Sequence, residues 1–302
     1  MRDAPTASSP AQVAAPRTQH AFADYVDLTK PRLNFLVVAS SAAGYYLGTR
    51  GTPDPVLMLE AVAGTALVAA GAAVLNQVYE RDTDALMRRT RQRPLPDARV
   101  GLPDATIFGS ALALGGLALL VARANGLAAA LALLTLLVYL AIYTPMKRRT
   151  PIATLVGAVP GALPPLIGWT ASRGMVDAGG AALFAIVFLW QIPHFMAISW
   201  MYRADYQAAG FPMLAVVDPE GRRASRQAVI YSAALLPVSL APAFFGIAGF
   251  AYALIAFILS TALAALALRF ARARNDATAR ALFFGSIVYL PLLWIAMIAN
   301  KL

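Results

Sequence analysis

The residues best suited to chemistry stand in one stretch, Asn76 to Arg93, which follows a long apolar run. Asn76, Glu80 and Asp84 are spaced four residues apart, so on a helix their side chains line one face. Mg²⁺ usually binds one or two carboxylates and completes its shell with water and substrate phosphates. The stretch therefore predicts a site where a divalent cation holds a polyanion at the mouth of a membrane helix.

Arginines strengthen this prediction, because their forked guanidinium groups suit phosphate oxygens. Four of them follow the carboxylates closely: Arg88, Arg89, Arg91 and Arg93. The alternative is a solvated helix end with ion pairs between successive turns. Three oxygen ligands in register and the nearby arginines favour a site. Asp82 falls on another helical face, so we expect it to lie outside that site.

The composition places this stretch in a membrane protein. Of 302 residues, 59% are hydrophobic and only 13% are charged, which is far more apolar than a soluble domain requires. The absence of cysteine excludes a disulfide framework or a thiolate site, and two histidines are too few for a histidine-rich metal centre. We therefore predict an all-α polytopic membrane protein, with about nine transmembrane helices around a central cavity.

Nine apolar runs are long enough, or nearly so, to cross about 30 Å of hydrocarbon. They span 33–49, 56–79, 104–122, 126–145, 152–171, 180–201, 228–246, 248–268 and 281–299. Prolines inside several runs indicate kinked helices. Residues 1–22 are rich in Ala, Pro, Ser and Thr and have no apolar core, so we predict a disordered tail there. A single transmembrane domain is expected over 23–302.

The positive charge indicates topology and not a nucleic-acid partner. With the N-terminus in the cytoplasm, nearly all of the 25 lysines and arginines fall on the cytoplasmic side. The exceptions are Arg50, Arg123, Arg173 and Lys301. The expected partner of the chain is thus the lipid bilayer, and no nucleic acid is expected. We predict a bacterial inner (plasma) membrane, with the mitochondrial inner membrane as the alternative.

A second polar cluster leaves a membrane helix on the same predicted side. Residues 200–206 contain Arg203, Asp205 and two tyrosines, about 120 residues after the first cluster. Because both clusters face one compartment in this topology, we expect them to share a site. A transporter is an alternative from another class, since kinked helices with polar groups also describe carriers. The charges stand at the membrane face and not at its midplane, which argues against a transporter.

The pattern N-x-x-x-E-x-x-T-D-x-x-M-x-R-T-x-x-R over 76–93 resembles the first signature of the UbiA superfamily of intramembrane prenyltransferases. Residues 27–38, 143–169 and 190–214 resemble the branch of that superfamily that farnesylates heme. The resemblance covers about residues 22–300 and implies a UbiA-type helical bundle. Glu80 stands where Asp is commoner, and Ala209 stands where many relatives carry a second Asp. The heme branch is similar in this respect, and the number of metal ions stays open.

This resemblance implies transfer of a farnesyl group from farnesyl diphosphate to a vinyl group of heme b. The products are heme O and diphosphate. The alternative is another UbiA-type enzyme that prenylates a quinone precursor or a chlorophyllide. The protein partners that the resemblance implies are a heme A synthase, which acts downstream, or oxidase assembly factors.

The resemblance also assigns roles to individual residues. It implies Mg²⁺ ligands at Asn76, Glu80, Asp84 and Asp205, and it adds Lys147 to the catalytic residues. Donors to the diphosphate are implied at Arg89, Arg93, Lys147, Arg148 and Arg203. Tyrosine rings that shield an allylic cation by cation–π contact are implied at Tyr139, Tyr143, Tyr202 and Tyr206.

His194 stands within an apolar run, where a polar side chain is costly and by default signals function. The resemblance to the heme branch implies that it contacts the porphyrin, through the iron or through a propionate. A packing histidine with a satisfied hydrogen bond is the alternative.

Overall fold

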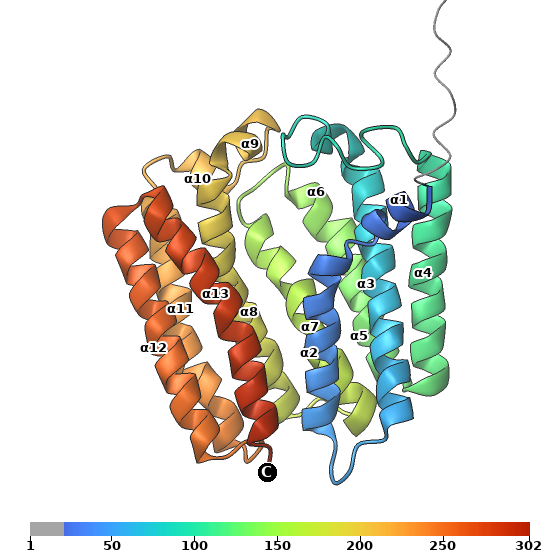
Figure 1. Ribbon diagram of the computed structural model, residues 1–302, viewed down its shortest axis with the longest axis vertical. Coiled ribbons are helices and arrows are strands. Elements are labelled where there is room, and N and C mark those ends of the chain that lie inside the picture. The colour runs from blue at the N-terminus through green and yellow to red at the C-terminus, as the bar shows by residue number, and fades with distance from the viewer. Residues whose placement is uncertain (1–20) are drawn as a thin grey trace, which may run out of the picture.

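The computed structural model describes residues 21–302, and in that range its regular structure is helical apart from one isolated β-bridge (Figure 1). Nine long helical segments match the nine predicted runs, so the prediction of an all-α membrane bundle is confirmed. They are α2 (Pro31–Gly48), α3 (Pro55–Asp84), α4 (Leu102–Arg123), α5 (Gly126–Leu137) continuing through η1 (Val138–Tyr143) and α6 (Thr144–Met146), α7 (Ala153–Arg173), α8 (Ala178–Met201), α11 (Arg222–Phe244), α12 (Phe250–Ala273) and α13 (Asp276–Ala299).

Seven of these segments are long and apolar enough to cross a membrane, and α2 and α7 are the exceptions. Both are rich in small residues, and α7 contains three prolines. A Cβ atom on Gly44 would overlap the backbone of Pro165, and one on Gly168 would overlap the backbone of Ser41. The two helices therefore pack backbone against backbone, which only small residues permit.

Helix α3 is long enough to carry its polar end beyond the hydrocarbon. Its 30 residues rise about 45 Å, against about 30 Å for the hydrocarbon core. The helix begins at Pro55, behind an Asp54 side chain that accepts hydrogen bonds from the backbone N–H groups of Val56 and Leu57. The last turns contain the buried carboxylates at the membrane face.

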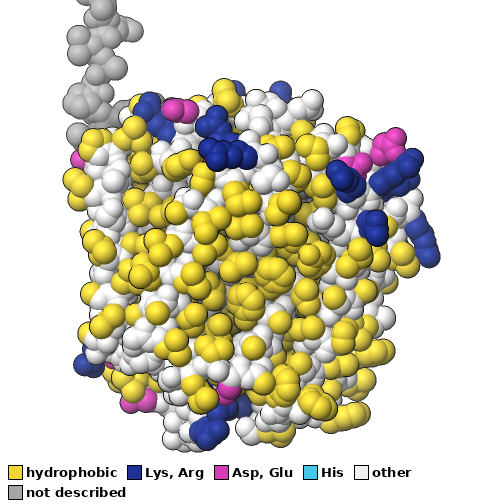
Figure 2. All heavy atoms as spheres, turned by 180° about the vertical axis from the view of Figure 1, so that it is seen from behind, with side chains coloured by type: hydrophobic (Ala, Val, Ile, Leu, Met, Phe, Trp, Pro, Cys, Tyr) yellow, Lys and Arg dark blue, Asp and Glu magenta, His cyan; other side chains and the backbone are white. Residues whose placement is uncertain are grey.

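The short helices gather at that same end of the bundle. They are α1 (Ala21–Leu28), α6, α9 (Arg203–Ala208) and α10 (Leu214–Val217), and the C-terminus of the chain lies at the opposite end (Figure 1). Figure 2 shows charged side chains at the two ends and an apolar surface between them. The predicted tail over 1–22 lies outside the described residues except for Ala21 and Phe22, which begin α1. The predicted central cavity stays a prediction.

Helices α11, α12 and α13 are held together by hydroxyl groups. The Tyr289 hydroxyl lies 2.6 Å from Ser239 Oγ and 3.0 Å from Ser260 Oγ, and the Tyr252 hydroxyl donates to the Ser239 carbonyl at 2.7 Å. All four side chains are buried. Because each of these four side chains has a partner, the hydrogen bonds offset the cost of burying the hydroxyl groups.

Candidate active site

The polar end of α3 has the expected helical register. Asn76, Glu80 and Asp84 are 2%, 5% and 1% exposed, whereas the Asp82 side chain is 98% exposed. Three oxygen-bearing side chains therefore share one buried face, and Asp82 faces away. A carboxylate that is buried this deeply requires a cation or several hydrogen-bond donors.

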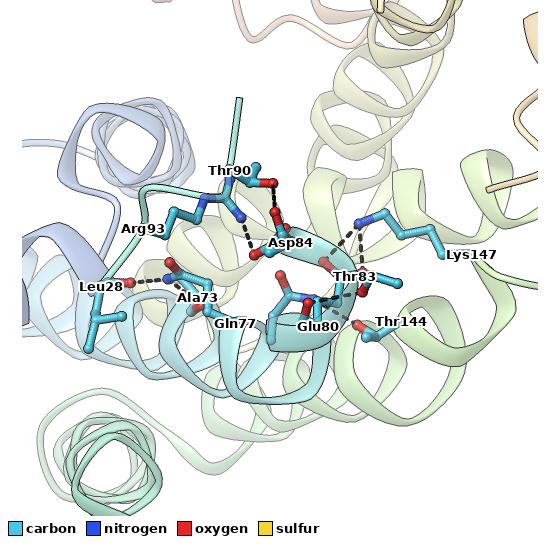
Figure 3. Close-up of polar contacts among 11 residues, drawn as sticks. Leu28, Ala73, Gln77, Glu80, Thr83, Asp84, Thr90, Arg93, Thr144 and Lys147 are labelled. Carbon is cyan, nitrogen blue, oxygen red and sulfur yellow. Dashed lines mark hydrogen bonds and ion pairs between the residues drawn. The ribbon is translucent and has the colours of Figure 1, made fainter. Parts of the chain in front are cut away.

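Lys147 supplies the cation for Glu80. Its ammonium donates to both carboxylate oxygens, at 2.8 and 3.0 Å (Figure 3). The same ammonium lies 5.4 Å from the ring centroids of Tyr143 and Phe211, within cation–π range. The end of α6 thus brings a lysine to α3 from 67 residues further along the chain.

Arg93 supplies the cation for Asp84, at 2.6 Å. The Thr90 hydroxyl donates to the Asp84 carbonyl at 2.7 Å, so the segment after α3 folds back over the helix end (Figure 3). This arrangement brings an arginine of the sequence motif directly onto a carboxylate of the same motif.

Asn76 is held by the π-helical segment η1. Its amide donates to Thr144 Oγ at 3.1 Å, and that hydroxyl donates to the Tyr139 carbonyl at 2.7 Å. The Thr144 N–H also bonds to the Tyr139 carbonyl, five residues back, which is the π-helical spacing. Tyr139 and Tyr143 stack with ring centroids 5.5 Å apart. Both predicted tyrosines of this helix therefore lie next to the α3 site.

Lys30 is coupled electrostatically to the charged residues of the site, and the sequence reasoning missed it. It precedes α2 in the left-handed backbone region, with φ at 50°. Burial and the positive charges of Arg93 and Lys147 lower its pKa to about 7, although the carboxylates of Glu80 and Asp84 oppose this shift. In the sequence, the lysine before Pro31 looked like an ordinary membrane anchor. Only its electrostatic coupling to α3 distinguishes it.

The buried face of α3 fits a divalent cation whose remaining ligands come from a phosphate group. Among residues 21–302, no three His, Cys, Asp or Glu side chains lie close enough together to hold a metal ion. Glu80 and Asp84 provide two carboxylates, however, and Asn76 adds an amide oxygen on the same face. Mg²⁺ needs no more protein ligands than these when a diphosphate supplies the rest. The assignment of metal ligands stays a prediction.

The loops after α3 and α8 lie side by side, as expected for clusters that share a site. The Arg89 guanidinium lies 5.0 Å from the Tyr202 ring centroid and 6.0 Å from that of Tyr206. Beneath this contact, Met87 packs in a buried apolar cluster with Phe211 and other residues after α9. The predicted residues Arg89, Tyr202 and Tyr206 are thus brought together at the loops.

The structure does not bring three other predicted residues to the α3 carboxylates. Arg203 donates to Asp276 at 2.9 Å and to the Trp200 carbonyl at 2.7 Å, so it faces α13. Asp205 has no side-chain hydrogen bond or ion pair to the described residues, and Arg148 is exposed. Their roles as metal ligand and diphosphate donors stay predictions.

His194 lies between aromatic rings in the seam of α8 and α13. Its Nδ1 is 2.8 Å from Ser286 Oγ, and its ring stacks against Trp190 and Phe283 at centroid distances of 5.3 and 5.1 Å. These contacts are those of the packing alternative, and they leave only Nε2 for a ligand. The porphyrin contact stays a prediction.

A helical bundle with buried carboxylates, basic partners and stacked tyrosines at one membrane face is that of an integral membrane protein. The sequence profile of the UbiA prenyltransferase family matches residues 37–289. The chain belongs to this family.

Individual relatives agree with that assignment. The chain is 44% identical to a protoheme IX farnesyltransferase of Solibacter usitatus over 287 residues, which are 92% of this chain and 98% of the relative. A solved digeranylgeranylglyceryl phosphate synthase shares the fold with a TM-score of 0.79 and 18% identity, covering 92% of this chain and 98% of that one. A UbiA homologue from Archaeoglobus fulgidus, bound to GPP and Mg²⁺, has a TM-score of 0.64 and 18% identity, covering 91% and 99%.

Proposed function

We propose that this chain is a protoheme IX farnesyltransferase, which transfers farnesyl from farnesyl diphosphate to a vinyl group of heme b. The observation that carries the proposal is the buried face of Asn76, Glu80 and Asp84 with Lys147 and Arg93 on its carboxylates. The near full-length likeness to protoheme IX farnesyltransferases supports heme as the acceptor and disfavours a quinone precursor or a chlorophyllide.

The first task of the site is to hold the diphosphate. Lys147 and Arg93 stand beside the carboxylates that would bind the metal, so both can donate to phosphate oxygens at the same place. Asn76, Glu80 and Asp84 are the proposed Mg²⁺ ligands, and Asp205 would join them only if its side chain turned toward the α3 face. Mg²⁺ would supply Lewis-acid stabilisation of the departing diphosphate. The UbiA homologue bound to GPP and Mg²⁺ supports the pairing of a divalent cation with an isoprenyl diphosphate.

The second task is to protect a carbocation. The allylic C–O bond breaks and its electron pair leaves with diphosphate, and a vinyl carbon of heme b then bonds to the farnesyl carbon. Water adds to the former vinyl group and loses a proton, giving a hydroxyethylfarnesyl side chain. Tyr139 and Tyr143 offer stacked rings next to the diphosphate position, where they can stabilise positive charge and exclude water.

The placement of the protein follows from the same proposal. A single catalytic domain over 23–302 spans the inner membrane of a bacterium, with the N-terminus and the α3 site on the cytoplasmic side. The support is that the topology predicted from the sequence puts nearly all basic residues on this side. Farnesyl diphosphate would then reach the site from the cytoplasm and heme from the bilayer. A heme A synthase is a protein that would use the product.

The experiment is to incubate the purified protein with heme b, farnesyl diphosphate and Mg²⁺, and to measure the mass of the extracted heme. We expect the mass of heme O, and no product with Glu80→Gln. Asp82→Asn is the matched control, because its carboxylate lies on the same helix but faces away. Prenylation of 4-hydroxybenzoate without conversion of heme would refute the heme assignment and favour the quinone alternative.

A further inference from the structure

A basic pocket lies at the end of the bundle opposite the α3 site. It has a volume of about 710 Å³ and is formed where α2, α7 and α13 end beside the turn between α11 and α12. Three cationic residues line it: Arg50, Arg173 and Lys301. These are three of the four basic residues that the predicted topology places away from the cytoplasm. Their convergence on one pocket has no part in the proposed reaction.

Arg173 is the cation with unused hydrogen-bonding capacity. Its Nε atom is buried without a partner among the described residues, and its guanidinium lies 4.8 Å from the Trp169 ring centroid. Among residues 21–302 its only ion pair is to Asp177, at 3.8 Å. The Oδ1 atom of Asp177 already accepts from the N–H groups of Gly179 and Gly180 at the start of α8. An unpartnered, buried donor of this kind points to a ligand that accepts hydrogen bonds.

Lys301 and Arg50 keep their charge uncompensated by any carboxylate among residues 21–302. The Lys301 ammonium donates to the carbonyl oxygens of Tyr46 and Thr49 at 2.7 and 2.8 Å, which are neutral partners at the end of α2. Burial and the positive charge of Arg173 lower the pKa of Lys301. Arg50 is exposed at the pocket rim. Of the three cations, only Arg173 has an ion pair to a carboxylate among the described residues, so the pocket favours an anion.

The surroundings of the pocket indicate the chemical class of that anion. Phe245 and Ile298 line it and are partly exposed, and the nearby Phe244 and Phe250 are 87% and 84% exposed. An apolar surface next to a basic pocket at a membrane face suits a molecule with a charged head and acyl chains. Guanidinium forks match phosphate oxygens in pairs.

We propose that this pocket binds the phosphate group of an anionic phospholipid, with the guanidinium of Arg173 as its principal donor. The headgroup occupies the space between Arg50, Arg173 and Lys301, and an acyl chain follows Phe245 and Ile298 toward the bilayer. The site is independent of the α3 carboxylates. By joining the ends of α2, α7 and α13, a bound lipid would stabilise the folded bundle.

The test is to titrate the purified full chain in detergent with phosphatidylglycerol, with phosphatidylcholine and with inorganic phosphate. Bound lipid is read by native mass spectrometry and the melting temperature by a thermal scan. We expect phosphatidylglycerol to bind more tightly than phosphatidylcholine and to raise the melting temperature. Arg173→Gln should weaken that binding about ten-fold or more, because it removes a charged donor.

Two further variants keep the test decisive. Arg50→Gln changes only an exposed rim residue, so it should fold normally and still weaken phosphatidylglycerol binding. Arg123→Gln is the matched control, because Arg123 lies at the same end of the bundle but pairs with Glu60 at 2.8 Å outside the pocket. Equal binding of both lipids by all four proteins would overturn the proposal. Stabilisation by inorganic phosphate alone, without lipid retention, would overturn the lipid assignment in favour of a free anion.

Discussion

The two polar clusters of this molecule look alike in sequence but differ in structure. At the end of α3, Glu80 and Asp84 are buried and each carries its own cation. After α8, Arg203 faces Asp276 on α13, and Asp205 has no side-chain partner among the described residues. The carboxylates of the first cluster lie on one continuous helix, whereas Arg203 and Asp205 lie on the short helix α9, after the break at Tyr202 that ends α8. The spacing of residues predicts which side chains point in the same direction only within one unbroken helix.

The largest effect is expected at the buried carboxylates. Glu80→Gln or Asp84→Asn should lower turnover by about 100-fold or more, because a neutral amide cannot supply the charge that a divalent cation requires. Asp82→Asn should stay near the parent rate. The measurement is heme O formation per folded protein, with circular dichroism as the control for folding. Equal losses at all three positions would contradict the register of α3.

A smaller effect on turnover is expected for the basic residues that donate hydrogen bonds to the diphosphate. Lys147→Gln and Lys30→Gln should each raise the KM for farnesyl diphosphate about ten-fold, since a charged donor is lost. The KM for heme should change little. Arg148→Gln is the matched control, because Arg148 is adjacent to Lys147 but exposed. A larger rise in the KM for farnesyl diphosphate with Arg148→Gln than with Lys147→Gln would show that Arg148, and not Lys147, is the diphosphate donor.

A substitution of Asp205 tests whether the second polar cluster acts together with the α3 carboxylates. If it turns toward the α3 carboxylates when substrate binds, Asp205→Asn should lower turnover as strongly as Glu80→Gln. If it stays where the structure has it, the loss should be much smaller, and we expect this outcome from its lack of partners. The readout is the Mg²⁺ concentration needed for half-maximal turnover. A shift as large as that of Asp84→Asn would restore Asp205 to the metal ligands.

A substitution of His194 distinguishes a porphyrin contact from a packing role. His194→Ala removes one hydrogen bond of Ser286 Oγ, which still donates to the Phe283 carbonyl, and should cost about 1 kcal/mol of stability. A porphyrin contact would add a selective loss of heme affinity with normal binding of farnesyl diphosphate. Separate titrations of the two ligands in detergent, together with the melting temperature, distinguish the cases. Parallel loss of both affinities would leave His194 with the packing role alone.

The smallest effect is expected at Arg203. Its pair with Asp276 is partly exposed, so Arg203→Gln should cost at most about 1 kcal/mol and leave the KM for farnesyl diphosphate unchanged. A double-mutant cycle with Asp276→Asn measures the coupling between the two residues. A raised KM with no coupling would show that Arg203 serves the diphosphate instead of α13.

The sequence was sufficient for the helices and for the α3 face, and the reasons are local. Apolar runs give the nine helical segments, and a four-residue spacing on an unbroken helix places Asn76, Glu80 and Asp84 together. Lys30 could not be found in this way, because its position depends on how the turn before α2 packs against α3. Arg203 could not be oriented, because Asp276 is a tertiary partner 73 residues away.

The π-helical segment before Lys147 has a consequence for how the site can vary. A π-helical turn holds one residue more than the α-helix around it, and each residue rotates a helix by roughly 100°. If 138–143 wound as a regular α-helix instead, that extra residue would rotate everything after it by roughly this angle. The Lys147 ammonium would then leave the Glu80 side of the helix. The π-helical winding of this segment, and not only its residue identities, therefore keeps Lys147 on the Glu80 side of the helix.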